Sequence, residues 1–93
     1  MANTEYNSVW DAIEVNPVEA ENLKLRSQLM IEISDYVKNS GLTQAEAAKK
    51  LGTTQPRLND VLKGKIDKCT VDRLVNMLAA IGYKVSMKIS HAA

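Results

Sequence analysis

The chain has 93 residues and a net charge of +1, and its 45% hydrophobic and 25% charged residues are the proportions of one soluble globular domain. It has no phenylalanine, a single cysteine, and no apolar run near the ~20 residues that span a bilayer. These features exclude an internal disulfide and a membrane-spanning helix, and a polar amino end without a signal peptide favours the cytoplasm.

The charges are distributed unevenly along the chain. Residues 1–37 carry seven acidic and two basic side chains, for a charge of −5, whereas residues 38–68 carry +4 and the remainder +2. The cationic middle could face the phosphates of a nucleic acid, and the acidic front could meet a basic partner. An ordinary mixed surface would give the same totals, so charge alone leaves both interpretations open.

Residues 1–16 predict an N-terminal arm that contains one short helix. Ser8 followed by Asp11 resembles a capping box at the start of a helix over residues 9–14. Asn16 precedes a proline, and a residue in that position avoids the α region, so the helix should end there.

A long helix is predicted over Pro17–Asn39. Proline suits the first turn of a helix, and the acidic residues that follow suit the positive end of the helix dipole. The apolar stripe has the four-residue spacing of an amphipathic helix and consists of Leu25, Leu29, Ile33 and Val37. Gly41 can take the left-handed conformation that ends a helix.

A short helix is then predicted over residues 44–51. Thr43 is a good N-cap, and Glu46 at the third helical position completes a capping box. Gly52 ends this helix and supplies the positive φ that a tight turn requires.

A second short helix follows this turn. Thr53 or Thr54 caps it, Pro56 is tolerated in its first turn, and it runs to about Lys63, where Gly64 ends it. The two short helices and the turn between them have the layout of a helix-turn-helix over residues 43–65.

The chain ends with one more helix and a strand. After a linker at residues 65–69, Thr70 caps a helix over Val71–Ile81, and the period then changes to the alternation of a strand over residues 83–90. The apolar face of this strand consists of Tyr83, Val85, Met87 and Ile89. No other strand is evident, so we expect its backbone to pair with a second copy of the chain or with another protein.

The pair of short helices holds the most informative residues. Ala47 and Ala48 are small enough to let the second helix pack closely across the first. The start of the second helix carries a polar set, which consists of Thr54, Gln55, Arg57, Asn59 and Asp60. In a helix-turn-helix, the N-terminal residues of the second helix face base edges in the DNA major groove.

This stretch resembles the helix-turn-helix of the Cro and phage-repressor (XRE) family. It reads Leu-Thr-Gln-Ala-Glu-x-Ala-x-x-Leu-Gly-Thr-Thr-Gln from residue 42, followed by Leu-x-Gly-Lys at residues 62–65, and the likeness covers about residues 27–81. The resemblance implies an all-α, repressor-like fold. We therefore expect one domain over residues 1–93, with five helices and a short C-terminal β-strand.

A narrower resemblance is to antitoxins of the HigA type. It rests on Val-Trp-Asp-Ala-Ile-Glu at residues 9–14, the run at residues 20–30, and the closing Leu-Val-Asn-Met-Leu-Ala-Ala-Ile-Gly at residues 74–82. This likeness implies repression of a toxin–antitoxin operon and neutralisation of a toxin protein.

The resemblance to the repressor family also implies two sets of DNA contacts. Bases would be read by Gln55, Pro56, Arg57 and Asn59, with Gln55 suited to adenine and Arg57 to guanine. Phosphates would be bound by Thr43, Gln44, Thr54, Lys63 and Lys65. Pro56 and Asp60 depart from the family pattern. Pro56 could contact a thymine methyl group, whereas Asp60 would repel phosphates and is assigned no contact.

The sequence thus predicts a sequence-specific transcriptional regulator, a repressor of antitoxin type. We expect it to bind double-stranded DNA as a homodimer on an inverted repeat, in the cytoplasm and associated with the nucleoid. The alternative is a protein-interaction module that mainly neutralises a toxin through the acidic front around Trp10. One histidine and one cysteine cannot supply a zinc site, and phosphate-loop and nucleophile motifs are missing, so we expect no enzyme activity, metal or cofactor.

Overall fold

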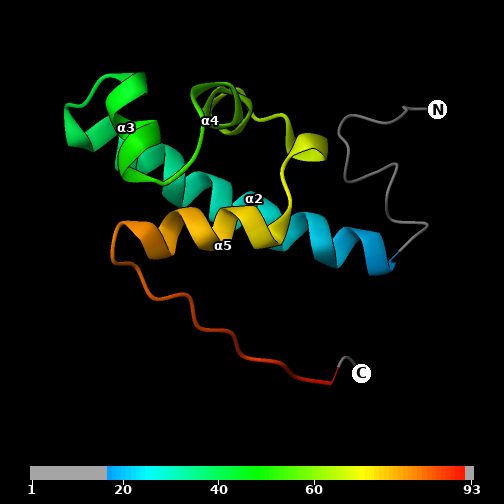
Figure 1. Ribbon diagram of the computed structural model, residues 1–93. Coiled ribbons are helices and arrows are strands. Elements are labelled where there is room, and N and C mark those ends of the chain that lie inside the picture. The colour runs from blue at the N-terminus through cyan, green and yellow to red at the C-terminus, as the bar shows by residue number, and fades with distance from the viewer. Residues whose placement is uncertain (1–16, 92–93) are drawn as a thin grey trace.

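The computed structural model describes residues 17–91 of the chain (Figure 1). Its elements are, in chain order, α2 (Pro17–Ser40), α3 (Gln44–Lys50), α4 (Gln55–Leu62), the 3-10 turn η1 (Ile66–Lys68) and α5 (Val71–Ala80). The four α-helices correspond to four of the five predicted ones and confirm the helical character of this part of the chain. The predicted N-terminal arm, with its short helix, lies outside the described residues.

Helix α2 is the element against which the others pack. Its predicted stripe faces the core, since Leu29 is 6% exposed and Ile33 is fully buried. The helix stops where Gly41 takes a φ of +73°, a conformation that side chains with a Cβ rarely adopt. Within residues 17–91, none of the helices combines the length and apolarity needed to cross a membrane.

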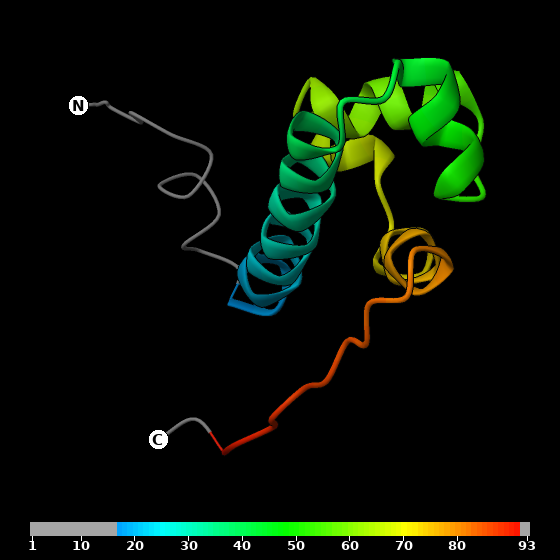
Figure 2. The same cartoon turned by 90° about the vertical axis from the view of Figure 1, so that its left-hand side faces the viewer.

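The remaining helices surround one aliphatic core. α5 packs on α2, while α3 and α4 pack on each other and on α2. Figure 2, in which α5 is seen end-on, shows the α3–α4 pair beside the C-terminal end of α2. The large side chains that are most deeply buried are Ile33, Leu51, Leu58, Leu74 and Leu78. Each contributes about 1.5–3 kcal/mol by leaving water, and together they fix the two short helices to the long one.

The linker before α5 is held by a long-range contact. One guanidinium nitrogen of Arg26, Nη1, donates to the carbonyl of Ile66 over 2.8 Å and to that of Cys69 over 3.3 Å. These partners are 40 and 43 residues away in the sequence. The linker, predicted without regular structure, therefore contains the turn η1 and is tied to α2.

Cys69 has a structural role in this linker. Its side chain is buried, and its Sγ donates to the carbonyl of Lys65 over 3.4 Å. Burial, and next the nearby carboxylate of Asp60, raise the pKa of the thiol. The thiol therefore stays protonated at neutral pH, which makes it a poor nucleophile.

The start of α3 has the predicted capping box. The hydroxyl oxygen of Thr43 accepts from the N–H of Glu46 over 3.2 Å, and Oε1 of Glu46 accepts from the N–H of Thr43 over 2.8 Å. These bonds, chiefly the one from the Thr43 N–H, lower the pKa of the Glu46 carboxyl. A carboxyl whose pKa is lowered on folding stabilises the fold above its unfolded pKa, and this stabilisation is lost as pH falls through the folded pKa.

Replacing Glu46 with glutamine should therefore flatten the acid side of the stability profile. Glutamine can accept the same hydrogen bond from Thr43, so the capping box is kept, but it does not titrate. In thermal denaturation between about pH 7 and pH 3, we expect the parent chain to lose more stability than E46Q as the Glu46 carboxyl protonates. If the parent chain and E46Q lost equal stability over this pH range, the capping box would not be coupled to pH.

The segment after α5 does not form the strand predicted over residues 83–90. Residues 83–91 have no regular secondary structure, and the segment runs away from α5 as an extended chain (Figure 2). A strand requires a ladder of backbone hydrogen bonds to a partner, and residues 17–91 contain no second strand. The alternation in the sequence was sufficient to predict an extended chain but could not supply a partner.

The start of this segment is nevertheless anchored. The N–H of Tyr83 donates to the carbonyl of Leu78 over 3.0 Å, and the Tyr83 ring meets Tyr36 edge-on with the centroids 6.4 Å apart. Val85 is partly buried against the core, whereas Met87 and Ile89 are 61% and 85% exposed. The anchored part thus ends near Val85, and the last predicted apolar positions face solvent.

Candidate nucleic-acid interface

The turn between α3 and α4 sets the angle at which the second helix leaves the first. Gly52 has a φ of +66°, and a Cβ placed on it would lie 3.7 Å from the Cβ of Ala80, an ordinary contact. Glycine is thus required for its backbone conformation rather than for space. The turn is closed by the N–H of Thr53, which donates to the carbonyl of Ala48 over 2.9 Å. Ala47 and Ala48 are 0% and 3% exposed, as their small size predicts for a close helix contact.

The first turn of α4 projects its side chains into solvent. Thr54 is the N-cap, and its hydroxyl oxygen accepts from the N–H of Arg57 over 3.3 Å. Gln55, Pro56 and Arg57 are all exposed in this turn, whereas Leu58 is completely buried. The buried leucine fixes the helix, and the three residues before it are available to a ligand.

Four of the predicted contact residues are brought together at one place. Gln44, Gln55, Pro56 and Asn59 line a shallow hollow of about 470 Å³ between the starts of α3 and α4. Nε2 of Gln44 donates to Oδ1 of Asn59 over 3.3 Å, which links the two helices. The amide N–H groups of Asn59 and the carbonyl oxygen of Gln44 can still bind other groups. The hollow therefore presents oriented amide donors and acceptors, the groups that read base edges.

The other predicted residues surround this hollow without lining it. Arg57 is exposed on the first turn of α4, Thr43 and Thr54 are the N-caps of α3 and α4, and Lys63 and Lys65 follow the end of α4. The oxygen of each threonine is occupied by its capping bond, but its hydroxyl hydrogen can donate to a phosphate. Asp60, to which we assigned no contact, is half-buried.

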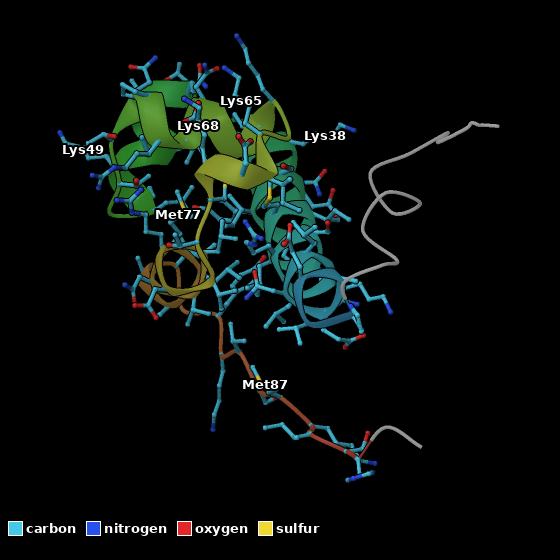
Figure 3. The ribbon with its side chains drawn as sticks, turned by 90° about the vertical axis from the view of Figure 1, so that its right-hand side faces the viewer. Lys38, Lys49, Lys65, Lys68, Met77 and Met87 are labelled. Carbon is cyan, nitrogen blue, oxygen red and sulfur yellow. The ribbon has the colours of Figure 1, made fainter. Side chains whose placement is uncertain are left out.

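The structure adds one candidate DNA contact, Lys49, that the sequence analysis did not predict. Lys49 lines a neighbouring hollow of about 340 Å³ together with Thr53 and Gln55, and so lies beside a predicted base-reading residue. It is exposed and stands with Lys50 in the last turn of α3, and Figure 3 shows it at the edge of the α3–α4 region. The pair of lysines just before Gly52 was the signal that could have identified it.

The described residues offer little to a metal. Within residues 17–91, His, Cys, Asp and Glu side chains nowhere gather in a group of three or more that could hold an ion. The arrangement on the α3–α4 face is one of amides, hydroxyls and lysines, which suits binding of a polyanion through hydrogen bonds and charge.

Comparison with known proteins supports this interpretation of the α3–α4 face. No curated protein matches the chain. A family model described as "Helix-turn-helix domain" matches residues 14–90, a range that includes every described helix. Proteins with this motif bind DNA by placing the second helix in the major groove. The chain belongs to this helix-turn-helix domain family, and the helix pair of its motif is α3 and α4.

Proposed function

We propose that the protein is a sequence-specific transcriptional regulator, a repressor of antitoxin type that acts as a dimer on an inverted repeat. The observation that carries the DNA-reading part of this proposal is the hollow at the start of α4, where Gln44, Gln55, Pro56 and Asn59 meet. A rigid turn and a buried leucine hold these groups in place, so that they are ordered before DNA arrives.

In the proposed complex, the first turn of α4 enters the major groove. The Gln55 amide pairs with N6 and N7 of an adenine, Arg57 reaches a guanine or a phosphate, and the Pro56 ring contacts a thymine methyl group. Asn59 is held in position by Gln44 and offers its amide group to the next base. Repression follows if the bound site overlaps a promoter, because the protein then excludes the polymerase.

Phosphate contacts position the protein on the duplex in this proposal. They are made by Thr43, Gln44, Thr54, Lys63 and Lys65, and we add Lys49 because it lies beside Gln55. Such contacts supply affinity that falls with salt and carry no sequence information. They leave base selection to the first turn of α4.

The proposed dimer uses the segment after α5. Its exposed apolar side chains, Tyr83, Met87 and Ile89, lie on a chain whose alternation suits a strand. Pairing of this segment with its symmetry mate would join two helix-turn-helix units, as the two half-sites of an inverted repeat require. A toxin protein that adds its own strand here is the competing occupant.

Replacing Gln55 with alanine should weaken binding to the operator and leave non-specific binding unchanged. A bidentate base contact discriminates by about 1–3 kcal/mol, roughly a five- to 150-fold change in the dissociation constant. Arg57→Ala should act similarly. Binding would be measured by fluorescence anisotropy on the promoter of the protein's own gene, located first by footprinting, and on a scrambled duplex of the same length.

Two control variants separate the contributions. Arg73→Ala removes an exposed arginine from α5, a helix that lines neither hollow of the proposed interface, and should leave both duplexes bound as before. Lys65→Ala should weaken binding to both duplexes alike and reduce the slope of log K against log salt by about 1. If Q55A and R57A leave DNA binding unaffected while binding to a partner protein fails, the protein is instead mainly an interaction module.

A further inference from the structure

An apolar groove runs along the side of α2 that faces the end of α4 and η1. It has a volume of about 440 Å³, within the range of pockets that hold aromatic groups. Its apolar lining includes Leu23, Met30 and Ile31 on α2, Leu62 on α4, and Ile66 on η1. Ile31 is 56% exposed and adds its side chain to this apolar patch, and an exposed apolar patch is more informative than a single exposed residue.

We propose that this groove is the docking site of the chain's own N-terminal arm, residues 1–16, with the side chain of Trp10 inside it. The arm joins α2 at Pro17, so its attachment point lies six residues before Leu23, at the near end of the groove. An occupant that is covalently joined beside its site has a high effective concentration and needs little intrinsic affinity.

The reach of the arm fits the length of the groove. A helix rises about 1.5 Å per residue, which puts Leu23 and Ile31 at about 9 and 21 Å from Pro17 along α2. If residues 9–14 are helical and the next three residues are extended, Trp10 lies about 16 Å from Pro17, between these two positions.

The apolar pattern of the arm also fits. Trp10 and Ile13 are three residues apart and share one face of the predicted short helix. Asp11 falls on the other side of that helix, and Glu14, four residues after Trp10, borders the apolar face. The helix can therefore turn an aromatic and an aliphatic side chain toward the groove, with Asp11 in solvent and Glu14 at the rim.

Charge favours the same occupant. The arm holds three acidic residues, Glu5, Asp11 and Glu14, and neither lysine nor arginine.

The surroundings of the groove are basic. Lys63 and Lys65 flank Gly64, which lines the groove, and Lys38 stands one helical turn beyond Ser34, which also lines it. Figure 3 shows Lys38 and Lys65 reaching into solvent in the same upper part of the molecule. These lysines outweigh Asp35, the one charged side chain in the lining, and attract an acidic segment.

Trp10 is the only tryptophan of the chain, so its fluorescence reports on the arm alone. In the folded 93-residue chain we expect its emission to be blue-shifted relative to the same chain in urea, and the shift to persist on serial dilution. Ile31→Glu places a charge in the groove wall and should shift the emission to the red. It should also raise quenching by acrylamide severalfold while the helical circular dichroism is unchanged.

A matched control is available on the same helix. Val18 is 81% exposed and lies outside this groove, so Val18→Glu should leave the Trp10 emission as it is. Ser27→Glu, a second substitution in the lining, should repeat the effect of I31E and covers the case in which I31E disturbs α2. Emission that matches the urea-unfolded chain would overturn the proposal. A shift that disappears on dilution would also overturn it, and would assign the groove to a second copy.

Discussion

Replacing Leu58 with alanine should lower the free energy of unfolding by about 2–5 kcal/mol, the range for a fully buried leucine. Leu58 is 0% exposed and belongs to the one core cluster that joins α2, α3, α4 and α5. Small domains are stable by only ~5–15 kcal/mol, so L58A should remove a large share of that stability. Urea denaturation followed by circular dichroism would measure the loss.

Leu62 provides the matched control for this prediction. It has the same side chain on the same helix but is only partly buried, so L62A should cost clearly less than L58A. If the two variants lost the same stability, burial of Leu58 would not be what fixes α4. DNA binding adds a second readout, because α4 is positioned by its buried side while its exposed side reads DNA. At low temperature, where L58A is still folded, we expect operator binding to be retained.

The helices were predictable because their signals are local. The structure ends α2 at Ser40, α3 at Lys50, α4 at Leu62 and α5 at Ala80, each within about one residue of the predicted end. Each of these ends is followed within two residues by a glycine with a positive φ. The starts of α3, α4 and α5 are marked equally well, since a threonine caps each of them. A cap and a stop are each contained within a few residues, which a single sequence displays directly.

The contacts that position the site are less local, and most of them could not be predicted. Arg26 holds the linker through carbonyls 40 and 43 residues away, and no pattern near Arg26 reveals these partners. The bond between Gln44 and Asn59 also spans two helices. Family resemblance predicts a DNA contact for each residue, but their mutual contact depends on how α3 and α4 pack. The tertiary arrangement therefore adds a link between two residues for which the sequence predicts only separate contacts.

The predicted C-terminal strand shows a second limit of prediction from sequence, in which the local conformation is correct but the partner is missing. The alternation of Tyr83, Val85, Met87 and Ile89 is a local signal for an extended chain, and the chain is extended there. A strand, however, is a property of two segments, and the second has to come from outside residues 17–91. The proposed dimer supplies that second segment from a symmetry mate, which makes the pairing testable with changes that leave the single chain intact.

Shortening the chain so that it ends at Ser86 should convert the proposed dimer to a monomer. Tyr83 remains and keeps its ring contact with Tyr36, and Val85 remains packed against the core. Only the exposed end of the segment, with Met87 and Ile89, is removed. A monomer loses the base contacts of one half-site. At about 1–3 kcal/mol per base pair, operator affinity should fall on the order of a hundredfold or more. Light scattering would give the molar mass, and anisotropy the affinity.

A proline at position 87 tests the backbone pairing itself. Met87 is 61% exposed, so both Met87→Pro and Met87→Ala should leave the fold of the single chain unchanged. Proline removes the N–H that a ladder needs, whereas alanine keeps it, and only M87P should therefore yield monomers. Loss of the dimer in both variants would mean that the methionine side chain, rather than the backbone, holds the two copies together.

A molar mass that stays that of a dimer in M87P and in the shortened chain would exclude this segment as the dimer interface. The two copies would then have to meet through another surface, and the exposed apolar side chains of the segment would be left for a partner protein.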